Sequence, residues 1–343
     1  MKILISVDPE IPVPPIYYGG IERIVDSLIN QYTDKGHEVY LIAHRDSNNK
    51  KAVKIFPWPR LSSRGTLNIV SNAKALYKAY KTIKPDIIHS FSRLLYLYPL
   101  LFLAHKSKLR IVQTYQREIN HKSTSLAHFL FGKKLFFTAC GHHLIENLPV
   151  KKYATGIHNF ADTNFYKDDS NIHKKHLMFL GRIQDIKGTK EAVNVALETN
   201  NELIIAGNIQ PGHDEYFENQ IKPYLENPLI NYVGPVNDEQ KLYYLQCSKA
   251  FLFPIKWEEP FGIVMAEAMA CGTPVIGFKR GSVPEVVIHN QNGFIVSDVN
   301  EMISAVNKID KIDRLEVRAD CEKRFSLEVI SKQYISLFSK MTS

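Results

Sequence analysis

The chain has 343 residues, of which 45% are apolar and 23% charged, the balance of a soluble globular protein. This length exceeds one ordinary domain and suits two domains of about 150–170 residues each. The composition excludes low-complexity, collagen-like and disordered classes, and the longest unbroken apolar run, residues 94–104, is too short to span a bilayer. Acidic residues near the N-terminus argue against a signal peptide, so we expect a cytoplasmic protein.

The net charge of +8 is unevenly distributed along the chain. Residues 1–165 carry 23 Lys and Arg against 11 Asp and Glu, a net charge of +12, whereas residues 166–343 carry 20 against 24, a net charge of −4. We therefore expect only the first half to meet an anionic surface or ligand. The four cysteines are far apart and form no CxxC pair, so neither a disulfide framework nor a zinc site is expected.

The predicted elements alternate between strands and helices from the N-terminus onward. A branched apolar run at residues 2–8 predicts a strand, helical spacing follows from Ile21 to Ile29, and residues 38–43 predict the next strand. Further strand-like runs follow with helical patterns between them, at residues 85–90, 109–115 and 135–141. This is the pattern of βαβ units in a parallel sheet.

A second alternating series starts at residue 176. It predicts strands at residues 176–182, 202–207, 230–234, 250–255, 274–278 and 293–296, and helices at 189–200, 216–227, 239–248 and 262–272. The fold class is therefore α/β, with two doubly wound domains over residues 1–165 and 166–325 and a final amphipathic helix assigned to residues 326–343. The helical pattern runs over residues 325–340, and its apolar side consists of Phe325, Val329, Tyr334, Leu337 and Phe338. Ligands of open α/β sheets bind at the carboxyl ends of the strands.

The most informative stretch is residues 257–276. Glu259 precedes a predicted helix and Glu267 lies about one turn into it, with the amides of Phe261, Gly262 and Ile263 at or near the helix N-terminus. Unpaired N–H groups there attract phosphate or sugar oxygens, and a carboxylate can accept from two neighbouring hydroxyls. An isolated pair of glutamates would more often be a helix cap and a surface charge. Here a binding role is favoured instead, because the full string from Pro260-Phe261-Gly262 to Gly272-Thr273-Pro274 matches a known pattern.

Two other stretches point to an anionic ligand. Arg182 and Lys187 stand before a predicted helix, and two fixed cations there suit a diphosphate. Gly19 and Gly20 follow the first strand, where glycine allows close approach of the backbone to a ligand. Each pattern taken alone also fits solvated side chains or a tight turn. Neither a Walker A loop nor GxGxxG occurs, which disfavours a dehydrogenase.

Together the three stretches resemble retaining GT-B glycosyltransferases, specifically glycosyltransferase family 4, over nearly the whole chain. The resemblance implies a GT-B fold of two Rossmann-like domains, an N-terminal acceptor-binding domain and a C-terminal nucleotide-sugar-binding domain. It also implies that the last helix packs back on the first domain. The implied activity is transfer of a hexose from a nucleotide diphosphate sugar, with retention at the anomeric carbon.

The resemblance also implies residue roles. Arg182 and Lys187 would neutralise the diphosphate, Glu259 would hold the donor sugar and Glu267 the ribose hydroxyls. The remaining implied donor-binding positions are Gly19, Gly20, Gly207, Gly234, Pro235, Val236, Phe261, Gly262 and Ile263. No DxD motif occurs, so we expect no metal ion and no other cofactor. A UDP-sugar such as UDP-glucose is favoured over GDP-mannose.

One position departs from the family pattern. Many relatives carry a histidine after the strand that corresponds to residues 109–115, and this chain has Gln116 there, which cannot take a proton at neutral pH. His89, at the end of another predicted strand, would point toward the cleft. We expect Gln116 and His89 on the acceptor and sugar side, although a histidine at a strand end is more often structural.

The acceptor stays open between a glycan, a lipid-linked molecule and a small molecule. Segments such as residues 74–86 and 126–134 mix Lys with large apolar side chains, which fits peripheral contact with an anionic membrane and equally fits core-facing apolar residues. Nucleic acid is not expected, since no binding module is present. The alternatives to a transferase are a nucleotide-sugar 2-epimerase and a non-catalytic nucleotide-sugar-binding protein.

Overall fold

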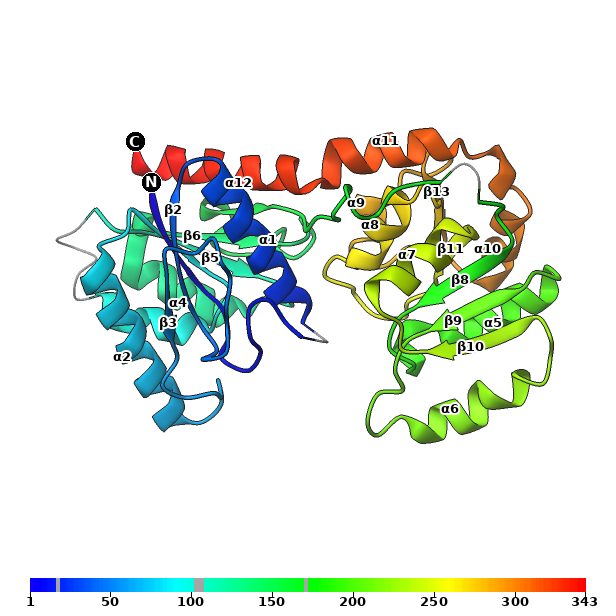
Figure 1. Ribbon diagram of the computed structural model, residues 1–343, viewed down its shortest axis with the longest axis horizontal. Helices are drawn as coiled ribbons and strands as arrows, with labels where there is room; N and C mark the ends of the chain where they lie inside the picture. Colours follow the sequence, from blue (N-terminus) through cyan, green and yellow to red (C-terminus); the bar gives the residue numbers. More distant parts are fainter. Residues whose placement is uncertain (17–18, 102–107, 170–171) are drawn as a thin grey trace. The chain divides into compact units, whose positions relative to one another are not determined.

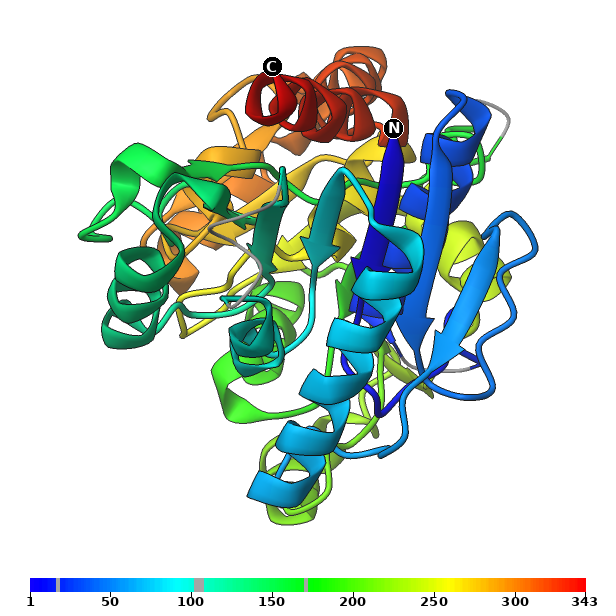
Figure 2. The same ribbon diagram turned by 90° about the vertical axis from the view of Figure 1, so that its left-hand side faces the viewer.

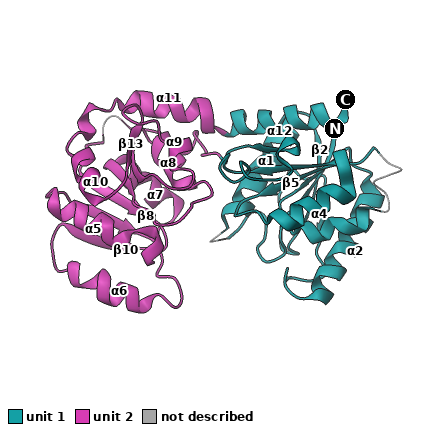
Figure 3. Cartoon of the chain, turned by 180° about the vertical axis from the view of Figure 1, so that it is seen from behind, with its two compact units in different colours: residues 1–159, 327–343 teal, residues 160–326 magenta. Residues whose placement is uncertain are grey.

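The computed structural model describes residues 1–16, 19–101, 108–169 and 172–343, and these divide into two compact units (Figure 3). Unit 1 comprises Met1–Asn159 and Leu327–Ser343, and unit 2 comprises Phe160–Ser326. The first boundary thus follows Asn159 rather than residue 165, and the second follows Ser326 rather than residue 325. Both units are α/β, as the alternating sequence pattern predicts.

The sheet of unit 1 has seven parallel strands in the order β3-β2-β1-β4-β5-β6-β7. Their apolar, branched sequences suit strands that are covered on both faces. The strands are β1 Lys2–Ser6, β2 Glu38–Ala43, β3 Lys54–Pro57, β4 Ile87–Ser90, β5 Arg110–Tyr115, β6 Leu135–Ala139 and β7 Ala154–Gly156. The strand order changes direction between β1 and β4, which is where open α/β sheets bind ligands.

Helices cover both faces of this sheet. One face carries α2 (Thr66–Ile83), η1 (Leu94–Leu100) and α4 (His121–Phe131), whose buried side chains share one apolar cluster with Leu4, Ile88 and Phe137 of the strands. The other carries α1 (Gly20–Asp34) and the C-terminal helix α12 (Leu327–Thr342) (Figure 1). Tyr32 of α1 meets Phe338 of α12 edge to face, with ring centroids 5.8 Å apart.

The C-terminal helix returns to the unit in which the chain begins. Tyr334 and Phe338 are almost fully buried in unit 1, whereas Phe325, which the sequence placed on the same apolar stripe, ends α11 (Arg314–Phe325) in unit 2. Residues 325–340 are therefore not one continuous helix. The break at Ser326 coincides with the second boundary between the units.

The sheet of unit 2 has six parallel strands in the order β10-β9-β8-β11-β12-β13, with the change of direction between β8 and β11. Its strands are β8 His176–Leu180, β9 Leu203–Ala206, β10 Ile230–Gly234, β11 Ser248–Phe253, β12 Val275–Phe278 and β13 Gly293–Val296. Its other helices are α5 Thr189–Glu198, α6 Asp214–Gln220, α7 Asp238–Gln246, α8 Ile263–Ala270, α9 Val283–Val286 and α10 Val299–Val306.

One predicted helix is shorter than expected. The pattern over residues 216–227 predicts a single helix, but α6 ends at Gln220 and a short 3₁₀ turn follows at Lys222–Tyr224. Pro223 explains the break, because proline donates no backbone hydrogen bond and its ring clashes with the preceding turn. All four cysteines are free and buried. Within the described residues no helix is long and apolar enough to cross a membrane.

Candidate functional site

Two of the predicted catalytic residues of unit 2, Lys187 and Glu259, meet at the change of strand direction. Lys187 lies in the loop after β8, and Glu259 follows β11. The Lys187 Nζ is 2.5 Å from Glu259 Oε2, and both side chains are about nine-tenths buried. Trp257 completes the cluster, because its indole N–H donates to the same oxygen at 3.0 Å and its ring lies 4.7 Å from the lysine Nζ.

Backbone packing fixes the loops that carry this pair. Gly188 has φ +78°, and a Cβ there would lie 1.9 Å from the Pro254 carbonyl oxygen, so only glycine lets the Lys187 loop approach the end of β11. Gly281 packs equally closely against the loop that carries Glu259, because a Cβ added at Gly281 would lie 2.3 Å from the Glu259 amide nitrogen. The lysine and the carboxylate are therefore held by rigid backbone.

Glu267 has its own cation. Lys241 of α7 places its Nζ 2.7 Å from Glu267 Oε1 and 3.3 Å from Asp238, and it also lies 4.9 Å from the centre of the Tyr166 ring. The other oxygen, Glu267 Oε2, is buried and has no hydrogen-bond partner in the described part of the chain. Burial, with the nearby Glu267 and Asp238 carboxylates, raises the pKa of Tyr166 well above its usual value.

Arg182 follows β8, and Phe261 to Ile263 lead into α8 from the segment that carries Glu259. The Arg182 guanidinium faces the Gln184 amide, whose oxygen, when turned toward it, accepts at 3.2 and 3.3 Å. Helix α8 starts after Gly262 (φ +71°), and no side chain in the described ranges caps its first-turn amides from Ile263 onward. Phe261 is buried, and its carbonyl accepts from the Ser282 hydroxyl at 2.7 Å.

The predicted glycines gather at the ends of neighbouring strands. A Cβ on Gly207 would lie 1.8 Å from the Gly181 carbonyl oxygen, and the Gly207 amide donates to the Gly234 carbonyl at 2.9 Å. Pro235 is exposed and Val236 is half-buried directly beyond this contact. Because Gly207 follows β9 and Gly234 ends β10, these positions border the same end of the sheet as Lys187 and Glu267.

Unit 1 contains a separate cavity of about 270 Å³ at the carboxyl ends of β1 and β5. Its polar lining consists of Asp8, Glu10, Glu22, Gln116 and Arg117. Burial, followed by the charge of Glu10, raises the pKa of Asp8, although Arg117 and Arg93 oppose the shift. Burial also raises the pKa of Glu22, and the charges of Asp8 and Glu10 add to this shift. A hydrogen bond from the backbone N–H of Glu22 itself opposes it.

Gln116 and His89 have different surroundings. The Gln116 amide exchanges two hydrogen bonds with the Asn159 amide, at 2.9 and 2.7 Å, and lines the cavity. His89 does not point into a cleft, which corrects the prediction from the sequence. Its ring is fully buried beneath Tyr334 of α12, its Nε2 lies 2.8 Å from the Thr114 hydroxyl, and burial lowers its pKa to about 3.

The glycines predicted to reach the donor from unit 1 stand at the start of α1. Gly20 is the first residue of the helix, and Gly19 precedes it without side-chain capping. A Cβ on Gly19 would lie 2.7 Å from Pro15 and 2.9 Å from a Glu22 carboxylate oxygen, so this turn is tightly packed. Tyr17 and Tyr18, also in the predicted loop, lie outside the described residues.

Sequence reasoning missed several polar residues of these sites, among them Asp8, Glu22, Trp257 and Lys241. Asp8 ends the predicted first strand and Glu22 lies in the predicted helix after Gly19 and Gly20, so their proximity could have been inferred from the turn between strand and helix. Trp257 lies inside the motif already singled out. Lys241 gave no signal, because a lysine in the first turns of a predicted helix is usually solvated.

Two protein families match the chain. Residues 162–325 match "Glycosyl transferases group 1", and residues 18–145 match "Glycosyltransferase Family 4". The chain belongs to these glycosyltransferases. Among curated relatives, an uncharacterized 42.6 kDa protein in the cps region of Klebsiella pneumoniae is 23% identical, covering 94% of this chain and 96% of that protein. A putative glycosyltransferase of Bacillus subtilis is 22% identical to this chain, and the match covers 91% of this chain and 83% of the Bacillus protein.

Solved structures share the GT-B architecture. HepE of Anabaena, in complex with UDP and glucose, aligns with a TM-score of 0.75 and 18% identity over 99% of this chain and 100% of that chain. A sucrose-phosphate synthase from Thermosynechococcus elongatus aligns with a TM-score of 0.80 and 16% identity, with 99% of both chains covered. At these identities the similarity establishes the fold, and the expected GT-B fold is confirmed.

Proposed function

We propose that this glycosyltransferase moves a hexose from a nucleotide diphosphate sugar to a hydroxyl group of an acceptor, with retention at the anomeric carbon and without a metal ion. The donor would be a UDP-sugar of the UDP-glucose type rather than GDP-mannose. The acceptor would be a glycan, a lipid-linked molecule or a small molecule.

The observation that carries this proposal is the Lys187–Glu259–Trp257 cluster beside the uncapped start of α8. A departing nucleoside diphosphate gains negative charge, and a fixed lysine with helix N-terminal amides stabilises that charge without reorganisation. Arg182 adds a second cation directly after β8, in the loop that also carries Lys187. These groups need no metal ion for the counter-charge.

The arrangement also provides for the rest of the donor. Glu267, with one buried oxygen that lacks a partner among the described residues, would accept from the ribose hydroxyls, and Glu259 would accept from sugar hydroxyls once Lys187 engages the diphosphate. Gly207 and the turn from Gly234 to Val236 would border the base. The UDP complex of HepE, a protein of the same fold, supports the choice of uridine.

The cavity of unit 1 supports a hydroxyl-bearing acceptor. Asp8 and Glu22 are carboxylates, which accept hydrogen bonds from hydroxyl groups and repel phosphates. Gln116 would donate or accept through its amide, and it would position the acceptor rather than remove its proton. Retention by attack from the leaving-group face needs no protein nucleophile, and none is proposed.

The test is calorimetric titration of the full chain with UDP, GDP, UDP-glucose and GDP-mannose in EDTA, repeated on Lys187→Ala and Glu267→Ala. We expect selective uridine binding in EDTA, weakened by Glu267→Ala. Turnover of UDP-glucose should fall by about 10²–10³-fold in Lys187→Ala, because a charge-stabilising group is lost.

Each alternative outcome has a defined meaning. GDP binding in place of UDP would reverse the donor choice, and a requirement for added metal would refute metal independence. Binding without transfer or donor hydrolysis would favour a nucleotide-sugar-binding protein, whereas conversion of the free donor to its 2-epimer would identify an epimerase.

A further inference from the structure

The outer side of α2 in unit 1 combines apolar and basic side chains in one stripe. Leu67, Val70, Lys74, Lys78 and Lys81 are all exposed and follow one another at intervals of three or four residues, so they share one face of the helix. Leu67 is 83% exposed. The opposite face of α2 is buried in the core of unit 1, so this stripe is not needed for folding.

A second helix repeats the pattern. In and just after α4, the residues Lys122, Leu126, Phe129 and Lys133 are exposed at the same spacing, and Phe129 is 83% exposed. Neither α2 nor α4 contains an acidic residue. None of the lysines in the two stripes pairs with a carboxylate within the described part of the chain.

The two stripes belong to one layer of the molecule. The buried sides of α2, η1 and α4 share one apolar cluster, and Tyr98 of η1 meets Phe131 of α4 edge to face at 6.4 Å. Figures 2 and 3 show α2 and α4 on the same side of the sheet. We call this the basic apolar surface, consisting of Leu67, Val70, Lys74, Lys78, Lys81, Leu95, Lys122, Leu126, Phe129 and Lys133.

The charge around this surface has one sign. Residues 60–134 contain 14 Lys and Arg against two acidic residues, Asp86 and Glu118. A partner must therefore be anionic, and it must also provide an apolar environment in which Leu67 and Phe129 become buried. An acidic protein or nucleic acid satisfies the charge, whereas a phospholipid surface also provides an apolar interior directly below its phosphates.

We propose that the basic apolar surface docks this protein on an anionic phospholipid bilayer, with α2 and α4 parallel to the membrane plane. Leu67, Val70, Leu126 and Phe129 enter the boundary between headgroups and acyl chains, and the lysines contact lipid phosphates. This inference goes beyond the proposed function and does not depend on it.

The test is flotation of the full-length protein with vesicles of phosphatidylcholine alone or of phosphatidylcholine mixed with phosphatidylglycerol. We expect binding to the mixed vesicles only, and weaker binding as the salt concentration rises. The variant Lys74→Gln/Lys78→Gln/Lys81→Gln should bind the mixed vesicles about a hundredfold more weakly than the parent protein, because each lysine contributes about fivefold to the affinity. Phe129→Ser should reduce binding about tenfold or more.

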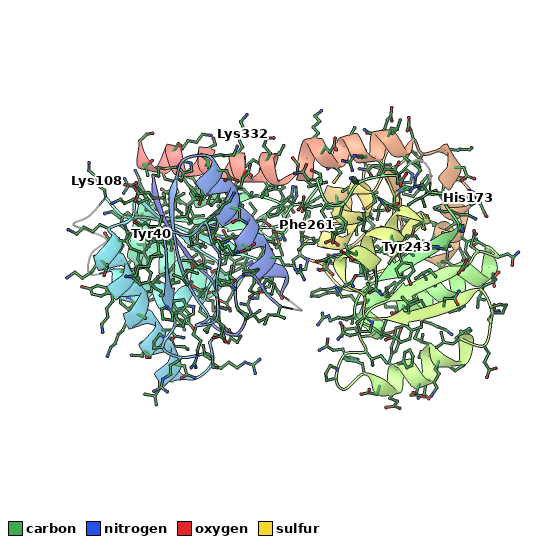
Figure 4. The ribbon with its side chains drawn as sticks, viewed as in Figure 1. Tyr40, Lys108, His173, Tyr243, Phe261 and Lys332 are labelled. Atoms are coloured by element: carbon green, nitrogen blue, oxygen red, sulfur yellow. The ribbon has the colours of Figure 1, made fainter. Side chains whose placement is uncertain are left out.

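Matched controls separate this surface from overall charge and hydrophobicity. Lys323→Gln/Lys332→Gln/Lys340→Gln removes the same charge from exposed positions on α11 and α12, and Figure 4 shows Lys332 pointing away from α12. Leu315→Ser removes an apolar side chain that is 70% exposed in unit 2. Both controls should bind the mixed vesicles as the parent protein does.

Three results would overturn the proposal. The first is failure of the parent protein to bind the mixed vesicles, and the second is an equal loss of binding in a variant and its control. The third is self-association of the parent protein in the absence of lipid that is lost in the Phe129→Ser variant. That result would make the surface an interface between two copies of the chain. UDP titration of the same variants should give the parent affinity, so failure of docking is distinguishable from failure of the proposed function.

Discussion

At the scale of single residues, each glutamate of the 259–267 motif is held by a lysine from another element. Lys187 comes from the loop after β8 and Lys241 from α7, and the two pairs have N–O distances of 2.5 and 2.7 Å. Breaking a buried ion pair costs more than forming it gains, because the remaining charge stays desolvated. A ligand that draws Lys187 away must therefore offer Glu259 new donors, and a sugar beside a diphosphate would do both.

Lys241→Met tests whether the second lysine positions Glu267 for the nucleotide. We expect the affinity for UDP to fall about tenfold, because the carboxylate loses the cation that fixes its orientation, and the free energy of unfolding to fall by about 1–3 kcal/mol. The measurements are calorimetry and urea unfolding. Lys241→Arg should retain most of the affinity.

A control separates positioning from general destabilisation. Arg324→Met removes the cation paired at 2.8 Å with Asp320, whose side chain is 9% exposed, on α11. It should destabilise unit 2 to a similar extent and leave the UDP affinity unchanged. A Lys241→Met protein that binds UDP as tightly as the parent would refute the positioning role.

At the scale of elements, the sequence predicts most strands and helices because their apolar periodicity is strong, as at residues 176–180 and 203–206. It does not predict β3, in which only Ile55 and Phe56 stand between Lys54 and Pro57, or β7, which has three residues and no large apolar side chain. It also misplaces Phe325, because the apolar stripe continues across Ser326 while the helix ends at Phe325 and a new one begins at Leu327. The positions around Lys187, Glu259 and Glu267 were predictable from a local motif, whereas Lys241 becomes visible only after α7 packs beside α8.

The packing of α12 on β4 gives unit 1 a dependence on pH. His89 lies beneath Tyr334 and Phe338, and its pKa of about 3 lies below the value of about 6.5 for an unfolded histidine. Between these values the unfolded chain binds a proton that the folded chain excludes. The stabilising contribution of the neutral ring is thus complete above about pH 6.5 and is lost as the pH falls toward 3.

His89→Gln should reduce this dependence. Between pH 7 and pH 5 the parent protein should lose about 2 kcal/mol more than the variant in the free energy of unfolding of unit 1. Urea unfolding followed by hydrogen exchange at α12 and β4 measures this quantity in unit 1 alone. His173→Gln removes an exposed imidazole, labelled in Figure 4, and should match the parent. Equal losses in His89→Gln and the parent would place the acid sensitivity elsewhere.

At the scale of the whole molecule, the two units share one order over six strands but differ in charge and in the sites they contain. Unit 1 carries 25 Lys and Arg against 11 Asp and Glu, a net charge of +14, and unit 2 carries 18 against 24, a net charge of −6. The more basic unit contains the acidic cavity and the basic apolar surface. The acidic unit contains the lysine cluster proposed for the diphosphate, so local geometry rather than net charge selects the ligand of each unit.

Hydrogen exchange of the full chain with and without UDP tests this division. If unit 2 binds the nucleotide, amides at residues 181–188, 234–236 and 257–265 should exchange more slowly, by up to about a hundredfold at a UDP concentration of about 100 times Kd. The strands β2 and β5 of unit 1 should exchange at their unliganded rates, because a ligand stabilises only the openings that release it. Protection concentrated in unit 1 would assign the nucleotide to the acidic cavity and reverse the proposed roles of the two units.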